Sequence, residues 1–424
     1  MFKNKKQYYF DHASTTPLDN KVLSLMLPYF SSEFGNPSNL YGMGRNANNA
    51  ISEATKTITK ILGCKMNEFI YTGSATEADN LAILGIARAN KEKGNRIIIS
   101  KIEHKGILSV CETLRKEGFD IIEIPVEKNG LLELSVLESA INPQTILISI
   151  SHADSETGTI QSISNISKII KSVREQNKSD FPYFHTDASQ TTAYLPINVD
   201  NLGIDLMTLS AHKLCGPKGI GGLYIRHGTR INPIIYGGGQ QNRLRSGTEN
   251  IPGIVGFAEA LSINEKNKKT EFKRIKRLRN ILERGIFKAI SRVVLNGHKT
   301  KRLPNFLNIS ILDIEGEAML LFLDEIGIMV NTGSACNSQS LEPSYILMAL
   351  GNPYEYIHGS IRFTLGKSNT ITDIKYVLKH LPKIVDKLRK ISPLNLHLNQ
   401  KSTISDPRAF IGNQTPHFLR KKNK

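Results

Sequence analysis

The feature that most constrains the fold is a regular alternation of short β-rich runs and helical patterns over the first 230 residues. Patterns with helical spacing, such as residues 76–92 and 163–176, separate most of the β-rich runs. Such alternation is typical of a mostly parallel sheet that is covered by helices on both faces. We therefore predict an α/β fold with a mostly parallel sheet of seven strands. The seven runs are FIYT (69–72), RIIIS (96–100), FDIIEIPV (119–126), TILISIS (145–151), FPYFHTD (181–187), LMTLSAH (206–212) and GGLYIR (221–226).

The pattern changes after this region, which indicates a second domain. A basic helical stretch at 264–285 is followed by a shorter β/α set that begins with FLNISI and ends with DIKYVLKHLPKIVDKL. We expect four parts: an N-terminal segment at 1–15 that packs with the small domain, a large domain at 16–262, a small α/β domain at 263–390, and a basic tail at 391–424.

The charge balance is strongly basic, with 55 Lys and Arg against 38 Asp and Glu, a formal net charge of +17. Much of the excess lies in the helical stretch at 264–285 and in the tail. We interpret the helical stretch as a solvated helix face, because no zinc-finger, RNP-type or basic-zipper pattern accompanies it. Direct binding to nucleic acid is therefore not expected, although the charge alone keeps that hypothesis open.

Other features bear on where the chain works. No stretch approaches the roughly 18 apolar residues that a spanning helix needs, so we expect no membrane span. The basic N-terminus lacks an apolar segment of the signal-peptide type. Four cysteines in 424 residues are too few for a disulfide framework. We therefore expect a cytoplasmic protein.

Polar residues follow five of the predicted strands at their carboxyl ends. In parallel α/β sheets, loops and helix N-termini converge there and ligands bind. We therefore predict one site built from five loops. The residues concerned are Gly73 to Glu77, then His104, then His152, Asp154, Ser155 and Glu156, then Asp187 and Gln190, and finally His212 and Lys213.

The residue types at these strand ends predict a cofactor. Ser74 with Glu77 forms a capping-box pattern, and a helix N-terminus favours an anion such as phosphate. Lys213 follows an apolar strand directly, so its amine could be desolvated enough to form a Schiff base. Asp187 could keep a pyridine nitrogen protonated, and Gln190 could donate to a ring hydroxyl. With a histidine to stack on the ring, the set predicts pyridoxal 5'-phosphate.

Rival cofactor motifs fit less well. The string GMGRNA at 42–47 matches a dinucleotide fingerprint, but no hydrophobic strand precedes it. His104, His152, His185 and His212 raise a metal hypothesis, yet no HExxH or comparable ligand spacing appears. We expect no resident metal.

The four cysteines differ in their surroundings. Cys64, Cys111 and Cys215 lie in apolar or turn contexts, where cysteine usually acts as a small hydrophobic residue. Cys336 lies in NTGSACNSQSLEPS, a run of small polar residues that suits an exposed loop. From this context it is either a reactive thiol or an incidental loop cysteine.

Taken together, the motifs resemble those of the cysteine desulfurases, fold-type I, class V pyridoxal-phosphate enzymes, and in particular the group that supplies sulfur for iron–sulfur clusters. The resemblance covers roughly residues 9–367. It rests on FDHASTTP, FGNPS, SATEADNLAI, EHK, HTDASQ, SAHKLCGPKGIGGLY, GGGQQNRLRSGTEN, GSACNSQSLEPSYILMALG and SIRFTLG. So many ordered motifs make it highly specific.

The resemblance implies a role for each matching residue. Lys213 would be the Schiff-base lysine, Asp187 the partner of the ring nitrogen, and His104 the residue stacked on the ring. Gln190 would contact the ring hydroxyl, and Arg362 would bind the substrate carboxylate. Cys336 would accept the sulfur and would contact a cluster only transiently. The phosphate would be held by Ala75, Thr76, Ser210 and His212, and by Thr248 of the other subunit of a homodimer.

The implied reaction converts L-cysteine to L-alanine and leaves the sulfur as a persulfide on Cys336. An acceptor, either an iron–sulfur scaffold protein or a component of tRNA thiolation, would then take the sulfur. Ser155 replaces an asparagine that contacts substrate and cofactor in the family, Tyr41 and Lys367 also depart from its pattern, and Gly73-Ser74 reverses the usual order. Two alternatives therefore stay open: a selenocysteine or cystine lyase, and a catalytically weakened cofactor-binding paralogue that acts as an assembly partner.

Overall fold

The centre of the molecule is a seven-stranded sheet, as the sequence predicts. The structure is a computed structural model that describes residues 6–332 and 343–391. The strands are arranged in the order β2-β8-β7-β6-β5-β3-β4, and all neighbours are parallel except β8, which is antiparallel to both β2 and β7. Their bounds are β2 Phe69–Thr72, β3 Arg96–Ser100, β4 Asp120–Ile124, β5 Thr145–Ser149, β6 Tyr183–Asp187, β7 Leu206–Ser210 and β8 Gly221–Ile225.

Helices cover both faces of this sheet. Successive side chains of a strand point to opposite faces, so a continuous apolar strand makes both faces apolar. In β3, Ile97 and Ile99 belong to the hydrophobic core beneath α4 and α5, whereas Ile98 belongs to the core on the other face. Among the described residues no helix is long and apolar enough to span a lipid bilayer. The helices of this part of the chain are α1 Asn20–Met26, α2 Pro28–Ser31, α3 Gly42–Leu62, α4 Ala75–Ala89, α5 Lys105–Lys116, α6 Leu134–Ala140, α7 Ile163–Asn177 and α8 Val199–Leu202.

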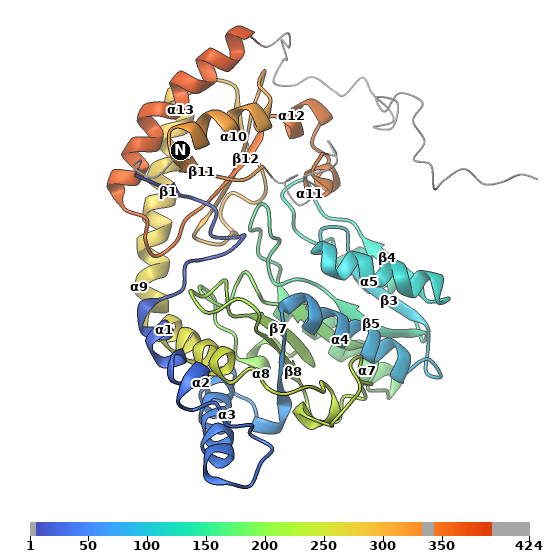
Figure 1. Cartoon of the computed structure of the whole chain (residues 1–424). Helices are drawn as coiled ribbons and strands as arrows, with labels where there is room; N and C mark the ends of the chain where they lie inside the picture. The colour runs from blue at the N-terminus through green and yellow to red at the C-terminus, as the bar shows by residue number, and fades with distance from the viewer. Residues whose placement is uncertain (1–5, 333–342, 392–424) are drawn as a thin grey trace, which may run out of the picture.

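The long helix α9 (Ile251–Ala289) joins this sheet to a second, smaller core, and Figure 1 shows it running along the side of both. Leu261 packs in the core of the seven-stranded sheet, and Ile275, further along α9, packs in the smaller core. The bounds proposed for the two domains stay predictions.

The smaller core is built on a three-stranded antiparallel sheet in the order β12-β10-β9. The N-terminal strand β1 (Tyr8–Tyr9) pairs in parallel with β11, which attaches the start of the chain to this part of the molecule. The remaining bounds are β9 Val293–Leu295, β10 Phe306–Ile311, α10 Gly316–Glu325, β11 Ile328–Met329, α11 Tyr345–Ala349, α12 Tyr354–His358, β12 Ser360–Thr364 and α13 Ile371–Ile391.

The basic stretch of α9 is only partly the solvated face that its sequence predicts. Ile275 and Leu278 face the core, as their helical spacing requires. Two of the basic residues are buried, however: Lys268 donates to the carbonyl of Leu195 at 3.0 Å, and Arg279 is only 3% exposed. These two cations support tertiary packing and are not available to a partner.

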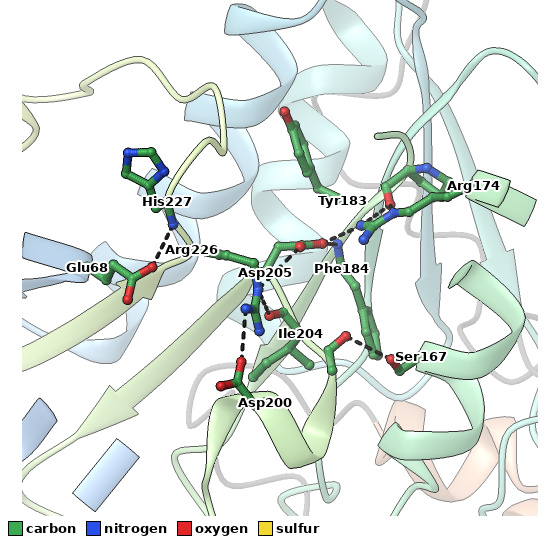
Figure 2. Close-up of polar contacts among 12 residues, drawn as sticks. Glu68, Ser167, Arg174, Tyr183, Phe184, Asp200, Ile204, Asp205, Arg226 and His227 are labelled. Atoms are coloured by element: carbon green, nitrogen blue, oxygen red, sulfur yellow. Dashed lines mark hydrogen bonds and ion pairs between the residues drawn. The ribbon is translucent and has the colours of Figure 1, made fainter. Parts of the chain in front are cut away.

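A buried carboxylate ties the strands together at their amino ends, opposite the predicted ligand-binding edge (Figure 2). Asp205, just before β7, accepts a hydrogen bond from the backbone N–H of Phe184 at 2.7 Å. It also pairs with Arg174 from α7, and it lies 3.8 Å from Nε of Arg226, which follows β8. Arg226 in turn reaches the exposed Asp200 at 3.0 Å. This cluster fixes β6, β7 and β8 relative to α7.

Candidate active site

Three residues predicted to act on one cofactor lie together at the carboxyl ends of the central strands. Asp187 is the last residue of β6, and Lys213 follows β7 by three positions. His104 is the N-cap of α5, where its Nδ1 accepts a hydrogen bond from the N–H of Gly106 at 3.1 Å. Burial, and secondarily Lys213, lowers the pKa of His104, while Asp187 opposes that shift. His104 is therefore neutral and lies within electrostatic reach of both Lys213 and Asp187.

The helix start that the sequence predicts as a phosphate site lies at the N-terminus of α4, but its capping pattern differs in one respect. Ser74 caps the helix by accepting the N–H of Glu77 at 3.1 Å. In a capping box the Glu77 carboxylate would accept the backbone N–H of Ser74. Here it accepts the N–H of Gly73 at 2.8 Å instead, and it pairs with Arg245. The Ser74-Glu77 prediction is thus half right, because Arg245 competes for that carboxylate.

The groups around this helix start suit a phosphate. Ala75 and Thr76 form the first turn of α4, whose free N–H groups and dipole favour an anion. The hydroxyl oxygen of Ser210, at the end of β7, is buried without a hydrogen-bond partner. A Cβ added to Gly221 would lie 2.6 Å from the carbonyl carbon of Ser74, so only glycine lets β8 approach this turn so closely.

His212 and Gln190 both contact the N-terminal segment. Nδ1 of His212 lies 3.1 Å from the hydroxyl of Thr15, and Gln190 donates to the carbonyl of Ala13 at 3.1 Å. Burial lowers the pKa of His212 to about 4, and Lys213 acts in the same direction. His212 is therefore neutral in the cofactor-free protein, and its ring N–H could serve a phosphate as a hydrogen-bond donor.

Arg362 lies on β12 and is held by groups distant in sequence. Its guanidinium donates to the Asp11 carboxylate at 2.7 Å, to the Ser14 hydroxyl at 3.0 Å and to the backbone carbonyl of Ser155 at 2.7 Å. Sequence reasoning proposed Arg362 but missed Asp11 and Ser14. Their signal was the FDHASTTP motif, which supported the resemblance but received no role of its own.

The loop after β5 contains Ser155 and is restrained by hydrogen bonds between its own residues. Asp154 accepts the backbone N–H groups of Glu156 at 2.9 Å and Thr159 at 2.9 Å. Burial raises the pKa of Glu156 to about 7, and its carboxyl contacts the hydroxyl of Ser344. Asp154 and Glu156 therefore organise this loop, and Ser155 presents its backbone to Arg362.

Glu103 is a buried carboxyl that the sequence did not single out, although it directly precedes His104. It is fully buried and accepts from the hydroxyl of Ser100 at 2.5 Å and from the N–H of Ser151 at 3.0 Å. Burial raises its pKa to about 7. The hydroxyl of Tyr345 donates to its backbone carbonyl at 2.7 Å, which ties α11 to the loop of His104.

Some predicted residues lie outside the described part of the chain, and others keep their roles as predictions. Cys336 lies in 333–342, outside the described residues, and so does the tail from 392 onward. Thr248 is exposed, and its contribution to a second subunit stays a prediction. Of the departures from the family pattern, Tyr41 is exposed and Lys367 pairs with Asp19 at 2.6 Å.

The residues present fit pyridoxal 5'-phosphate. A buried hydroxyl without a partner and a helix N-terminus would hold the phosphate, and a carboxylate stands at a strand end for the ring nitrogen. Lys213 supplies the amine. It lies close enough to these groups to lower the pKa of both His104 and Asp79. Taken together, these groups supply what this cofactor requires from a protein.

Comparison with known families and structures agrees with this site. Residues 8–377 match the family model described as aminotransferase class-V, and the chain belongs to that family. A solved structure called a NifS-like protein superposes with a TM-score of 0.84 at 34% identity, covering 90% of this chain and all of that one. Another, described as SspA in complex with cysteine, gives a TM-score of 0.74 at 34% identity over 85% of this chain and 99% of that one.

Curated relatives narrow the assignment within the family. The cysteine desulfurase IscS of Dictyoglomus turgidum is 47% identical over 400 residues, which is 94% of this chain and 100% of the relative. The cysteine desulfurase IscS of Methanosarcina thermophila is 46% identical over 92% of this chain and 94% of that protein. The chain is accordingly a cysteine desulfurase of this group, a pyridoxal-phosphate enzyme.

Proposed function

We propose that this chain converts L-cysteine to L-alanine and passes the sulfur, through a persulfide on Cys336, to an iron–sulfur scaffold protein or another acceptor such as the tRNA-thiolation machinery. The observation that carries the proposal is the grouping of Lys213, His104 and Asp187 at the carboxyl edge of the sheet, with an anion seat at the N-terminus of α4. When bound, pyridoxal phosphate withdraws electrons from the α-carbon of an amino acid.

Each residue of the site has a distinct task in this reaction. Lys213 would hold the cofactor through its amine, and the same amine could take a proton from the α-carbon of the substrate. His104 is neutral, so it can stack on a cationic ring without repulsion and can accept a proton. Asp187 accepts the N–H of Ser189 at 2.7 Å, which restrains the carboxylate that would hold the ring nitrogen in its protonated form.

Arg362 would orient the substrate. Its guanidinium is held in a fixed plane by Asp11 and Ser14, so it is already ordered before substrate arrives. A planar fork of this kind suits a carboxylate. The α-carboxylate of cysteine bound there would place the substrate sulfur for attack by the Cys336 thiolate. The new sulfur–sulfur bond would form as the bond between that sulfur and the β-carbon breaks, and the carbon skeleton would keep the electron pair, take up protons and leave as alanine.

A homodimer is part of the proposal, since Thr248 would complete the phosphate seat of a second copy. Large apolar side chains are exposed on α1, α2 and the segment before α3, including Phe34 at 66% and Leu40 at 88%. A depression of about 490 Å³ is lined by Pro37 and Ser38 from that segment and by residues 238–242 and 249. The segment that carries Phe34 and Leu40 and the loop that carries Thr248 therefore meet at this depression, which suits contact with a second copy.

We further propose a cytoplasmic location. Persulfide transfer needs free thiols, which a reducing compartment maintains. Three cysteines, Cys64, Cys111 and Cys215, are free among the described residues.

The test is mass spectrometry of the cofactor-loaded protein after exposure to L-cysteine, with alanine measured in parallel. We expect a mass increase of one sulfur on the Cys336 peptide and release of alanine. Cys336→Ala should lose the adduct and keep the cofactor absorbance, and Cys64→Ala is the matched control that should keep both. Faster turnover on selenocysteine or cystine than on cysteine would favour the lyase alternative, and alanine release without any adduct on Cys336 would contradict the proposal.

A further inference from the structure

A carboxylate lies at the helix start that is proposed to receive the cofactor phosphate. Glu77 is in the first turn of α4, and its Oε2 accepts the backbone N–H of Gly73 at 2.8 Å. A Cβ added to Gly73 would lie 2.7 Å from this oxygen, so glycine leaves room for that contact. The Glu77 side chain is only 18% exposed, so water and salt screen its negative charge incompletely.

This negative charge opposes the binding of a phosphate. A phosphate monoester carries a charge of about −1.5 to −2 at neutral pH. The free N–H groups of Ala75 and Thr76 belong to the same helical turn as Glu77, so an anion bound there meets the carboxylate at close range. Left alone, Glu77 would therefore offset part of the attraction that the helix dipole supplies.

Arg245 supplies the cation that compensates this charge. Its Nε donates to Oε1 of Glu77 at 2.8 Å, and its Nη2 lies 3.5 Å from Oε2. The Arg245 side chain is 27% exposed, so the pair is partly buried and less screened than a pair on the open surface. The guanidinium thus holds the carboxylate and cancels its charge, while the carboxylate keeps its contact with Gly73.

The loop that carries Arg245 is attached to the sheet just before the phosphate turn. Gln241 accepts the backbone N–H of Tyr71 in β2 at 2.9 Å, and Arg245 forms a parallel β-bridge with Ile235. Residues 241–243 have φ values of 49°, 57° and 65°. Residues other than glycine adopt this left-handed conformation at an energetic cost and keep it only where surrounding contacts impose it. The loop therefore brings Arg245 to Glu77 in a fixed position before any cofactor binds.

We propose that Arg245 is a positioning residue for the cofactor phosphate: it neutralises Glu77 and holds it at the N–H of Gly73, so that the start of α4 accepts a dianion. This inference rests on the proposed function insofar as the start of α4 receives that phosphate. It gives a role to a residue of the GGGQQNRLRSGTEN motif that the sequence alone left without one.

The first experiment compares two ligands that differ only in the phosphate. Pyridoxal 5'-phosphate and pyridoxal are titrated into cofactor-free protein, and absorbance reports the Schiff base. Arg245→Gln should raise the Kd of pyridoxal 5'-phosphate by roughly 10–100-fold and that of pyridoxal by less than about threefold, because only the phosphate meets the uncompensated carboxylate. Arg88→Gln is the matched control, since it breaks the pair with Glu117 in the last turn of the same helix and should change neither.

The second experiment separates a charge effect from a merely structural one. Arg245→Gln combined with Glu77→Gln should bind pyridoxal 5'-phosphate within about threefold of the wild type, because no carboxylate remains to be neutralised. Glu77→Gln alone should bind it at least as tightly as the wild type, since glutamine still offers an acceptor to Gly73. Arg245→Lys keeps the charge and should bind far more tightly than Arg245→Gln, and this comparison holds even if the glutamine variant needs the second substitution to fold.

The third experiment uses inorganic phosphate and needs no Schiff base. Phosphate should raise the unfolding temperature of the cofactor-free wild type more than that of Arg245→Gln, because a ligand stabilises the fold that binds it. Equal shifts overturn the inference. So do equal losses for pyridoxal and its phosphate in Arg245→Gln, a failure of Glu77→Gln to restore binding, or a loss in Glu77→Gln as large as in Arg245→Gln.

These outcomes are distinct from a failure of the proposed function. A wild-type protein that forms no Schiff base with either ligand would contradict the proposed function, while the phosphate shift in cofactor-free protein would still test Arg245. Conversely, equal phosphate shifts would remove the role of Arg245 and leave the role of Lys213 intact.

Discussion

At the scale of single residues, the site depends on groups whose charge is set by burial. His104 and His212 are neutral because desolvation lowers their pKa, so neither repels Lys213. Glu103 and Glu156 are the opposite case, since burial raises the pKa of each to about 7. These carboxyls therefore change charge within the physiological range, and they do so beside His104 and Ser155.

Glu103 should make stability depend on pH in a defined direction. Between its ordinary pKa near 4.5 and its folded pKa of about 7, the folded protein keeps a proton that the unfolded chain has lost. The stability from this proton is present at low pH and is lost as pH rises through about 7. We expect Glu103→Gln to gain stability relative to the wild type by up to about 3 kcal/mol between pH 5 and 8.

Urea unfolding of both proteins at these two pH values measures this gain. Glu112→Gln, at an exposed position of α5, is the matched control and should show no such pH dependence. A Glu103→Gln variant that differs from the wild type by the same free energy at both pH values would contradict the assignment.

Arg362 should control the use of substrate but not the binding of cofactor. Arg362→Lys keeps the positive charge and loses the planar fork that contacts both Asp11 and Ser155. We expect kcat/KM for L-cysteine to fall by roughly 10–100-fold, as loss of one or two charge-assisted hydrogen bonds implies, with the cofactor absorbance unchanged. Arg389→Lys, which alters contacts with backbone carbonyls in the small domain, should change neither. An unchanged kcat/KM in Arg362→Lys would show that the substrate carboxylate binds elsewhere.

At the scale of elements, the strands could be predicted closely and the contacts between distant elements could not. The run at 69–72 matches β2 residue for residue, because a short apolar run bounded by polar residues is typical of a buried strand. The basic helix predicted at 264–285 is part of α9, which begins at Ile251 because Asn250 caps it and Pro252 is tolerated in the first turn. Local pattern therefore located the helix but not its start.

The candidate site shows the same division between local and long-range information. Lys213, Asp187 and His104 were predictable because each lies at or shortly after the end of a strand. The partner of Arg362 was not, since Asp11 lies 351 positions away in the sequence.

The cluster around Asp205 (Figure 2) should carry much of the stability of the sheet's amino-terminal edge. Asp205→Asn removes the charge that pairs with the half-buried Arg174 and leaves that arginine without its ion-pair partner. We expect a loss of about 2–4 kcal/mol in the free energy of unfolding. Asp200→Asn breaks an exposed pair with Arg226 and should cost less than about 1 kcal/mol.

Urea unfolding of the two variants beside the wild type checks this difference. Equal losses would mean that the buried position of Asp205 gives its ion pairs no advantage over an exposed one.

At the scale of the whole molecule, the proposed phosphate site needs a second copy of the chain, because Thr248 would reach the site of its partner. Phe34→Asp with Leu40→Asp should disrupt the exposed apolar face and yield monomers by light scattering, with weaker cofactor retention because Thr248 no longer reaches a second site. Leu321→Asp, at a position 68% exposed on the small domain, should leave the dimer intact. A wild-type mass near 47.2 kDa, that of one chain, would contradict the dimer.

The most direct test of the central claim is to treat the cofactor-loaded protein with borohydride, digest it and locate the cofactor by mass spectrometry. We predict that the cofactor is fixed covalently to the peptide that contains Lys213, and that Lys213→Ala abolishes the adduct while Lys218→Ala does not. An adduct on any other lysine, or no adduct in protein that has taken up the cofactor, would contradict the account.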